Sequence, residues 1–211
     1  MKITVLGATG RTGGLAVQEA LARGWHVTAV VRSAARLAVP AHPRLDVAVH
    51  PSLTDPALTD SVTGRDAVVL ALGPADRKPT TVNSDATRAV ASALRGSATR
   101  FVVVSASGLP AQGDSLAARL LLKPLLGAVL RNGYNDLRVM ESVLHAEPTV
   151  RWTIVRPTRL TNGPARGRVR SRVGADVRGS FQIARADVAR VLLDAAEEDG
   201  LVGKTVCISQ G

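Results

Sequence analysis

The chain has 211 residues, of which 45% are hydrophobic and 21% are charged. These proportions are typical of a globular protein that can bury a substantial core. The formal charge of +10 at pH 7 favours an anionic ligand, although a GC-rich genome would also enrich the chain in arginine. Aromatic residues make up only 2% of the chain, which argues against a nucleic-acid surface built on base stacking.

Cysteine content and apolar runs indicate the expected location. Cys207 is the single cysteine of the sequence, so no internal disulfide can form and a reducing cytoplasm is expected. The first strand-like run follows Met1 and Lys2 directly, which leaves no room for a signal peptide. The apolar run 116–130 is interrupted by charges and a proline, and is too short to cross a bilayer. The four histidines lack the spacing of metal ligands, so no metal site is predicted.

Strand-like runs alternate with helical patterns along the chain. Strands are predicted at residues 3–6, 26–31, 45–49, 67–71, 101–104, 152–155, 168–173, 180–183 and 205–208. Helices are predicted at residues 11–23, 56–62, 81–94, 116–130, 135–145 and 186–198, with Asn132-Gly133 separating the fourth from the fifth. This alternation predicts an α/β fold with a doubly wound parallel sheet. We expect a single Rossmann domain over residues 1–211, with a small substrate-side appendage after Arg156.

A glycine-rich turn, Gly7-Ala8-Thr9-Gly10-Arg11-Thr12-Gly13, joins the first strand to the first helix. Gly7 permits a tight turn with positive φ, Gly10 lets a pyrophosphate approach the backbone, and Gly13 lets the helix pack closely on the sheet. The N–H groups and the positive dipole end of that helix would then face the phosphates. The alternative is a structural turn without a ligand. The dinucleotide site predicted here comprises Gly7, Thr9, Gly10, Arg11, Thr12 and Gly13.

The end of the second strand suggests which dinucleotide is bound. NAD-binding folds usually place an acidic residue there, which accepts hydrogen bonds from the ribose 2′-hydroxyl. This chain has Arg32 at that position, with Arg36 nearby and Arg11 in the glycine turn. Three guanidinium groups favour a 2′-phosphate, so NADP(H) is the predicted cofactor. Otherwise these arginines are solvated surface charges.

Ligands of such sheets bind at the carboxyl ends of the strands. The loops at residues 72–81, 105–113 and 156–164 are therefore functional candidates. Ser105 and Ser107 are the first catalytic candidates, since either hydroxyl could bind a substrate carbonyl or the nicotinamide amide. Either serine could equally satisfy local backbone groups.

With these residues placed, the chain resembles the atypical short-chain dehydrogenase/reductases. It is most similar to the biliverdin reductase B/flavin reductase-like NAD(P)H-binding proteins of the NmrA-like superfamily. The matching segments are residues 7–13, 30–32, 66–68, 72–73, 79–82, 101–105, 155–157 and 182–189. The resemblance implies cofactor contacts at Leu72, Gly73, Thr80, Ser105 and Pro157. It also implies that Arg159 and Leu160 border the substrate pocket.

The chain departs from typical short-chain dehydrogenases, which carry a Tyr-x-x-x-Lys pair for proton transfer. Tyr134 has Arg138 in the lysine position, which makes Tyr134 a third catalytic candidate. In a second register, anchored on Glu141, Gly133 and Leu137 fill the two positions and Tyr134 packs at the start of a helix. We favour the second register. The aspartate expected near the adenine is also missing, since residues 49–52 read Val-His-Pro-Ser.

A site without a proton donor is compatible with flavin reduction, because hydride passes directly to the flavin and the proton can come from water. The leading hypothesis is therefore NADPH-dependent reduction of a flat, conjugated, anionic small molecule such as a flavin, quinone or tetrapyrrole. Ten arginines between residues 151 and 190 would favour a phosphate or carboxylate on that molecule. The alternatives are a non-catalytic NADP(H) sensor, as the NmrA-like resemblance implies, and a nucleotide-sugar epimerase or dehydratase.

Overall fold

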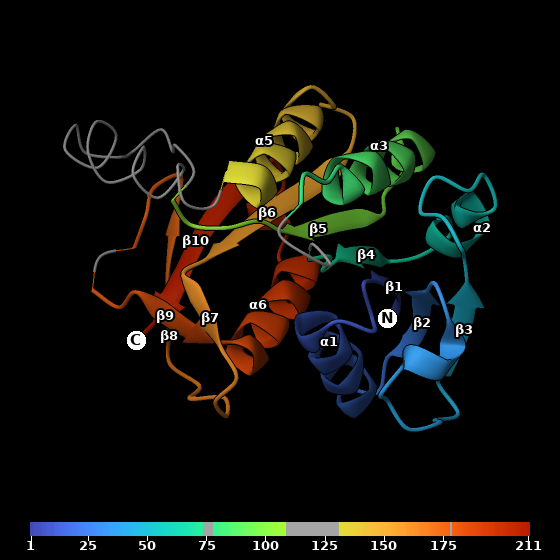
Figure 1. Cartoon of the computed structure of the whole chain (residues 1–211), viewed down its shortest axis with the longest axis horizontal. Helices are drawn as coiled ribbons and strands as arrows, with labels where there is room; N and C mark the ends of the chain where they lie inside the picture. Colours follow the sequence, from blue (N-terminus) through green and yellow to red (C-terminus); the bar gives the residue numbers. More distant parts are fainter. Residues whose placement is uncertain (74–77, 109–130, 178) are drawn as a thin grey trace.

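The computed structural model describes residues 1–73, 78–108, 131–177 and 179–211. Within them an eight-stranded sheet has the order β3-β2-β1-β4-β5-β6-β10-β8 (Figure 1). Its strands are β1 (Lys2–Leu6), β2 (His26–Val31), β3 (Leu45–Val49), β4 (Ala67–Leu70), β5 (Arg100–Val104), β6 (Arg151–Pro157), β8 (Val169–Val173) and β10 (Lys204–Gln210). Neighbouring strands are parallel except β8, which runs antiparallel to β10. The predicted doubly wound α/β fold is confirmed.

Helices cover both faces of this sheet. The α-helices are α1 (Arg11–Ala22), α2 (Leu58–Val62), α3 (Val82–Leu94), α5 (Arg131–His145) and α6 (Arg185–Glu197). Helices α1 and α6 lie on one face, and α3 and α5 lie on the other (Figure 1). The sheet is therefore buried on both sides, which explains why β4 and β5 are continuous apolar runs without alternation. The strand order reverses between β1 and β4, so the carboxyl ends of these strands form the switch point of the fold.

A small second sheet lies beside the carboxyl ends of the main strands. It pairs β7 (Arg159–Thr161) with β9 (Gln182–Ala184) in parallel. Strand β7 follows β6 directly, and β9 leads directly into α6. Among the described strands after Arg156, β8 and β10 belong to the main sheet, and this pair is what remains of the predicted appendage. Strand β7 was not expected from the sequence, because three residues are too few to show a period.

Most predicted elements are confirmed to within two residues, but the start of one helix is wrong. Helix α5 begins at Arg131 rather than at 135, so Asn132-Gly133 does not interrupt it. Its buried residues Met140 and Leu144 pack in the core, and this packing outweighs the weak helix propensity of one Asn-Gly pair. Strand β6 extends through Pro157, because β5 and β10 pair with it on both sides. The predicted helix at 116–130 lies outside the described residues. In the part of the chain that is described, no helix has the length and apolarity needed to span a membrane.

Candidate functional site

The glycine turn brings three backbone segments into contact. Gly7 has a φ of +85°, and a Cβ built on it would lie 2.6 Å from the carbonyl oxygen of Ala71, after β4. A Cβ on Gly13 would lie 2.2 Å from the carbonyl oxygen of Gly7. The N–H of Gly10 donates to that same oxygen at 2.8 Å. Positive φ at Gly7 and close packing at Gly13 are therefore as the sequence predicts.

Helix α1 starts with its first N–H groups uncapped by a side chain. Gly10 is the N-cap residue, it has no side chain to offer, and the first turn holds no acidic residue. Thr9, Gly10 and Arg11 are exposed, whereas the Thr12 side chain is buried. This end of the helix combines accessible backbone donors with a positive dipole, which suits an anionic ligand.

Two basic side chains stand at the end of the neighbouring strand. Arg32 directly follows β2 and is exposed, and Arg36 lies on a short 3₁₀ helix, Ala34–Arg36, and is also exposed. Neither forms an ion pair with any residue in the described ranges. Because β2 is adjacent to β1 in the sheet, Arg32 lies beside the glycine turn.

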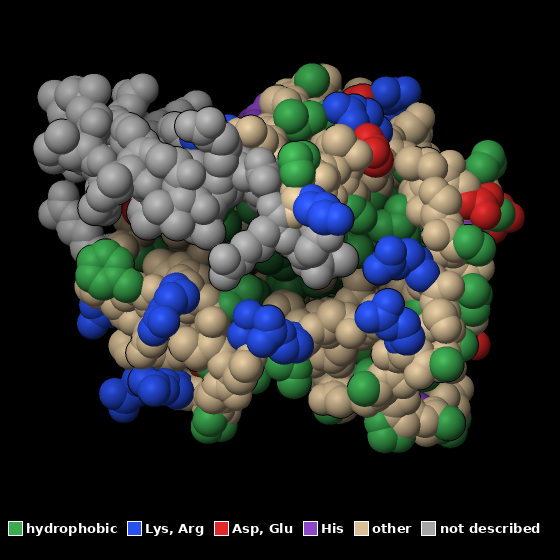
Figure 2. Space-filling model, viewed as in Figure 1, with side chains coloured by type: hydrophobic (Ala, Val, Ile, Leu, Met, Phe, Trp, Pro, Cys, Tyr) green, Lys and Arg blue, Asp and Glu red, His purple; other side chains and the backbone are tan. Residues whose placement is uncertain are grey.

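Three arginines at the amino edge of the sheet form ion pairs. At the amino edge, Arg23 at the end of α1 donates to Asp194 at 2.7 Å, and both Arg100 and Arg151 contact Asp199, at 3.2 and 2.6 Å. Figure 2 shows a hollow between the positions of α1, α3 and α6, with hydrophobic side chains in its floor and several Lys and Arg side chains around it.

Ser105 is buried at the end of β5 and its hydroxyl is engaged. The hydroxyl donates to Oε1 of Glu141 on α5 at 2.6 Å. Arg156 of β6 donates from Nε to the same oxygen at 2.8 Å, and from its terminal nitrogen to Oε2. Burial alone would lower the pKa of Arg156, but its hydrogen bonds to Glu141 raise it above the ordinary value. Ser105, Glu141 and Arg156 thus form a buried, charge-compensated cluster that ties α5 to the sheet.

Tyr134 and Ser107 are joined through the backbone. The Tyr134 hydroxyl donates to the carbonyl oxygen of Ser107 at 2.7 Å, and the ring borders Gly108. The Ser107 hydroxyl in turn donates to the carbonyl oxygen of Arg156 at 3.2 Å. Burial, with the negative charge of Asp176 nearby, raises the pKa of Tyr134 above its ordinary value. Tyr134 lies near the start of α5, with its hydroxyl bonded to the backbone of the loop after β5.

The structure brings the other predicted residues to the same edge of the sheet. Half-buried Leu72 and exposed Gly73 follow β4, and half-buried Thr80, just before α3, accepts the N–H of Val82 at 3.3 Å. The remaining predicted residues are Pro157, buried at the end of β6, and Arg159 and Leu160, both on β7.

The two residues of β7 differ in environment. Arg159 is exposed and donates to the side-chain oxygen of Gln182 at 3.1 Å. Leu160 is half-buried and packs on the core beneath α1 and α6. The exposed guanidinium is thus the part of β7 that is available to a ligand.

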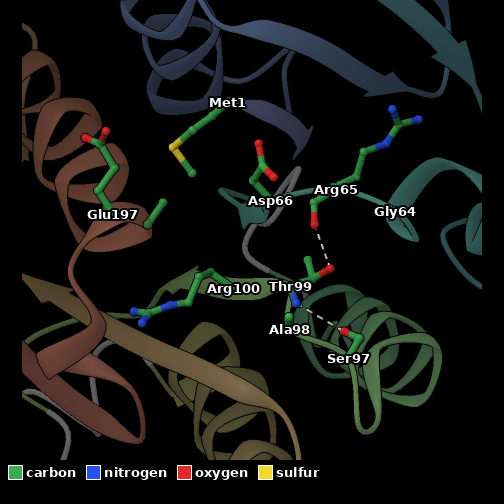
Figure 3. Close-up of a pocket in the computed structure, with 10 residues that line it drawn as sticks. Met1, Gly64, Arg65, Asp66, Ser97, Ala98, Thr99, Arg100 and Glu197 are labelled. Atoms are coloured by element: carbon green, nitrogen blue, oxygen red, sulfur yellow. Dashed lines mark hydrogen bonds between the residues drawn. The ribbon is translucent and has the colours of Figure 1, made fainter.

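A separate pocket of about 680 Å³ lies at the opposite, amino edge of the sheet (Figure 3). Its lining includes Met1, Asp66 and Arg100, which stand at or just before the starts of β1, β4 and β5. The hydroxyl of Thr99 in its wall donates to the carbonyl oxygen of Arg65 at 2.7 Å. This pocket is separated from the glycine turn by the length of the strands, and it is not part of the candidate site.

The sequence did not reveal two contacts at the starts of α3 and α6. Asp136 of α5 accepts the backbone N–H groups of Asn83 and Ser84 at 2.9 and 3.0 Å and so caps α3. Arg185, the first residue of α6, donates to the side-chain oxygen of Asn162 at 2.6 Å. The position of Arg185 at a predicted helix start was visible in the sequence, but its neighbours were not.

The sequence matches a known protein family and a protein of Bacillus subtilis. A family model described as NAD(P)H-binding matches residues 7–199, so the chain belongs to that family. The Bacillus subtilis protein YwnB is 29% identical over 211 aligned residues, which cover 93% of this chain and 92% of YwnB.

Two solved structures share the fold over nearly the whole chain. A Streptococcus pneumoniae protein named as a candidate NADH-flavin reductase has a TM-score of 0.78 and 25% identity, with all of both chains covered. A short-chain dehydrogenase/reductase from Veillonella parvula, solved with NADP, has a TM-score of 0.79 and 22% identity, covering 99% of this chain and 94% of that chain.

The buried cluster at α5 generates a prediction about stability. Replacing Glu141 with Gln leaves the Arg156 guanidinium buried without its counter-charge, which should lower the free energy of unfolding by about 3–5 kcal/mol. Asp85→Asn, which removes an exposed pair with Arg88 at 2.9 Å, is the control and should cost less than about 1 kcal/mol. Urea denaturation of both variants measures the difference. Equal losses in the two variants would show that the buried cluster does not hold α5.

Proposed function

We propose that this member of the NAD(P)H-binding family is an NADPH-dependent oxidoreductase that passes hydride to a flat, conjugated acceptor such as a flavin, quinone or tetrapyrrole. The observation that carries the proposal is the state of the candidate proton donors. The hydroxyls of Ser105, Ser107 and Tyr134 each donate to a group of the protein itself. An acceptor that takes its proton from solvent suits such a site better than a simple ketone does.

The residues at the carboxyl edge fit a dinucleotide. Gly10 has no side chain at the N-cap position, and the start of α1 presents N–H groups that no side chain caps. In this proposal Gly7, Gly10 and Gly13 shape the turn, and the pyrophosphate binds to the N–H groups beside Thr9, Arg11 and Thr12. Leu72, Gly73 and Thr80 would border the cofactor after β4, and Ser105 and Pro157 would border the nicotinamide end.

The residues around the acceptor would act mainly by positioning. When bound, the nicotinamide of NADPH supplies the hydride. The protein holds donor and acceptor together, and this orientation accounts for most of the rate in the proposal. Arg159 and Leu160 of β7 would border the acceptor. The acceptor gains one negative charge with the hydride, and a proton from water neutralises that charge.

The support for NADPH over NADH is the charge at the end of β2. Exposed Arg32 and Arg36 present planar guanidinium groups where an acidic residue would bind the 2′-hydroxyl of NADH. The Veillonella parvula relative was solved with NADP. Both observations favour a cofactor that carries a 2′-phosphate.

The direct test is NADPH consumption with a panel of FMN, riboflavin, quinones and biliverdin, followed by the loss of absorbance of the reduced nicotinamide. We expect at least one of these acceptors to be reduced, and aldehydes and simple ketones to be poor substrates. Tight binding of NADPH without its oxidation by any acceptor would contradict the proposal. That result would instead favour the non-catalytic sensor.

Gly10→Ala tests the glycine turn as the pyrophosphate site. The new methyl group would occupy the space of the pyrophosphate, so NADPH affinity should fall more than about tenfold, or 1.4 kcal/mol. Gly14→Ala is a matched control, since its Cβ would meet the Ala8 carbonyl oxygen at 3.3 Å, much as a Cβ on Gly10 would meet the Gly7 oxygen at 3.1 Å. Calorimetric titration measures both. An unchanged dissociation constant for Gly10→Ala would remove the turn from the proposed site.

Arg32→Asp tests cofactor choice. The change replaces attraction for a 2′-phosphate with repulsion, and a charge-assisted hydrogen bond contributes about 1.5–3 kcal/mol. The ratio of NADPH to NADH affinities should therefore shift at least about tenfold toward NADH. Arg44→Asp makes the same charge change at the amino end of β3 and should leave the ratio unchanged. Wild-type protein that binds NADH as tightly as NADPH would overturn the assignment.

Tyr134→Phe tests the source of the proton. A general acid contributes about 10²–10⁴-fold to the rate. Because the Tyr134 hydroxyl is bonded to the Ser107 carbonyl, we expect the variant to reduce its acceptor within about tenfold of wild type, a barrier change below about 1.4 kcal/mol. Steady-state kinetics measure it. An enzyme that reduces a ketone rapidly and loses that activity with Tyr134→Phe would restore the Tyr134–Arg138 pair as the proton-transfer dyad.

A further inference from the structure

Two arginines open the two helices that cover one face of the sheet. Arg11 is the first residue of α1, and Arg185 is the first residue of α6. The helices run side by side in the same direction, since Arg23 at the end of α1 contacts Asp194 and Glu197 near the end of α6. Their first residues therefore lie together at the carboxyl edge of the sheet.

The charges of this arginine pair are not neutralised by the described part of the protein. The hydrogen-bond partner of Arg185 there is the neutral side-chain oxygen of Asn162, at 2.6 Å, and exposed Arg11 has none. The nearest acid in sequence, Asp187, is buried and accepts the N–H groups of residues 166 and 167 at 2.9 and 3.0 Å. Burial, together with the positive charge of Arg11, lowers the pKa of Arg185 below its ordinary value.

Two adjacent guanidinium groups without a carboxylate repel each other, and a bound dianion would remove this repulsion. A phosphate monoester carries about −1.5 to −2 charges at pH 7 and three acceptor oxygens. Guanidinium groups bind such oxygens in bidentate pairs. The hydrogen bond to Asn162 holds Arg185 in place and leaves its other N–H groups to a ligand.

The sheet order places Arg185 on the acceptor side of the glycine turn. Strand β2, with Arg32 at its end, lies on one side of β1, whereas β4, β5 and β6 lie on the other. Helix α6 packs against β4, β5 and β6. Asn162 directly follows β7, the segment that carries Arg159. The 2′-phosphate of a cofactor held at Arg32 would therefore lie on the opposite side of the turn from Arg185, and Arg11, which the sequence grouped with Arg32, faces Arg185 instead.

We propose that Arg185, with Arg11, binds the phosphate monoester of a phosphorylated acceptor, so that the protein prefers FMN to riboflavin. The inference rests on the proposed function, since it names the acceptor class at the same site. It makes Arg185 a specificity-determining residue that contacts the acceptor away from the atoms that react.

The test compares two flavins that differ only in the phosphate. Binding of FMN and of riboflavin to the NADP⁺-loaded protein is followed by quenching of flavin fluorescence, which needs no turnover. We expect wild type to bind FMN about tenfold or more tightly than riboflavin. Arg185→Gln should lower FMN affinity about tenfold and leave riboflavin and NADPH affinities within about twofold. Arg88→Gln, an exposed arginine on α3 at the other face, should change neither flavin.

Two results would overturn the inference. The first is equal affinity of wild type for FMN and riboflavin. The second is an Arg185→Gln variant, shown to be folded by its thermal melting curve, that loses NADPH affinity while keeping its flavin preference, because the pair would then serve the cofactor. A wild type that prefers FMN in binding but oxidises NADPH with none of the flavins, quinones or biliverdin would overturn the proposed function and leave the phosphate site supported.

Discussion

The contact between the backbone of Gly13 and the carbonyl group of Gly7 is the constraint on which the carboxyl edge depends. A Cβ at Gly13 would lie 2.2 Å from that oxygen, and one at Gly7 would lie 2.6 Å from the Ala71 oxygen. Strand β1, helix α1 and the end of β4 therefore meet with backbone against backbone. Any side chain at these two positions would push α1 away from the sheet. Because α1 packs along α6, its position also sets where Arg185 stands.

A second set of contacts places the helices on the other face. Asp136 and Glu141 of α5 are both buried. Asp136 accepts hydrogen bonds from the start of α3, and Glu141 accepts them from Ser105 and Arg156. Burial alone would raise the pKa of Asp136, but the hydrogen bonds from Ser84 and Asn83 lower it. This contact therefore stabilises the fold above the ordinary pKa of a carboxyl group and is lost as the pH falls through the lowered value.

Much of the fold could be predicted from the sequence because its signals are local. The strands His26–Val31 and Leu45–Val49 have the predicted bounds, and Gly24 ends α1 with a φ of +77°. The errors occur where tertiary contacts decide. Helix α5 continues through Asn132-Gly133 because its later residues are anchored in the core, and β7 exists because β9 pairs with it.

The candidate site also has features that the sequence predicts and features that only the folded structure shows. The edge on which it lies follows from the strand–glycine–helix order, so the sequence predicts it. The engagement of the Ser105 hydroxyl does not follow, because Glu141 is 36 positions away. A loop serine is free or occupied according to its neighbours in space, and the sequence shows only its neighbours along the chain. The same limit explains why Tyr134 could be placed in either of two registers.

The arrangement of charge bears on a question that the composition left open. A formal charge of +10 could reflect genome composition or a ligand. At the amino edge Arg23 contacts Asp194 and both Arg100 and Arg151 contact Asp199, whereas Arg11 and Arg32 have no acid partner within the described residues of the carboxyl edge. Unmatched charge costs stability through repulsion, and it raises the rate at which anions reach a hollow surface. In the proposed function, the unmatched charges of Arg11 and Arg32 would attract the anionic dinucleotide and its acceptor to the carboxyl edge.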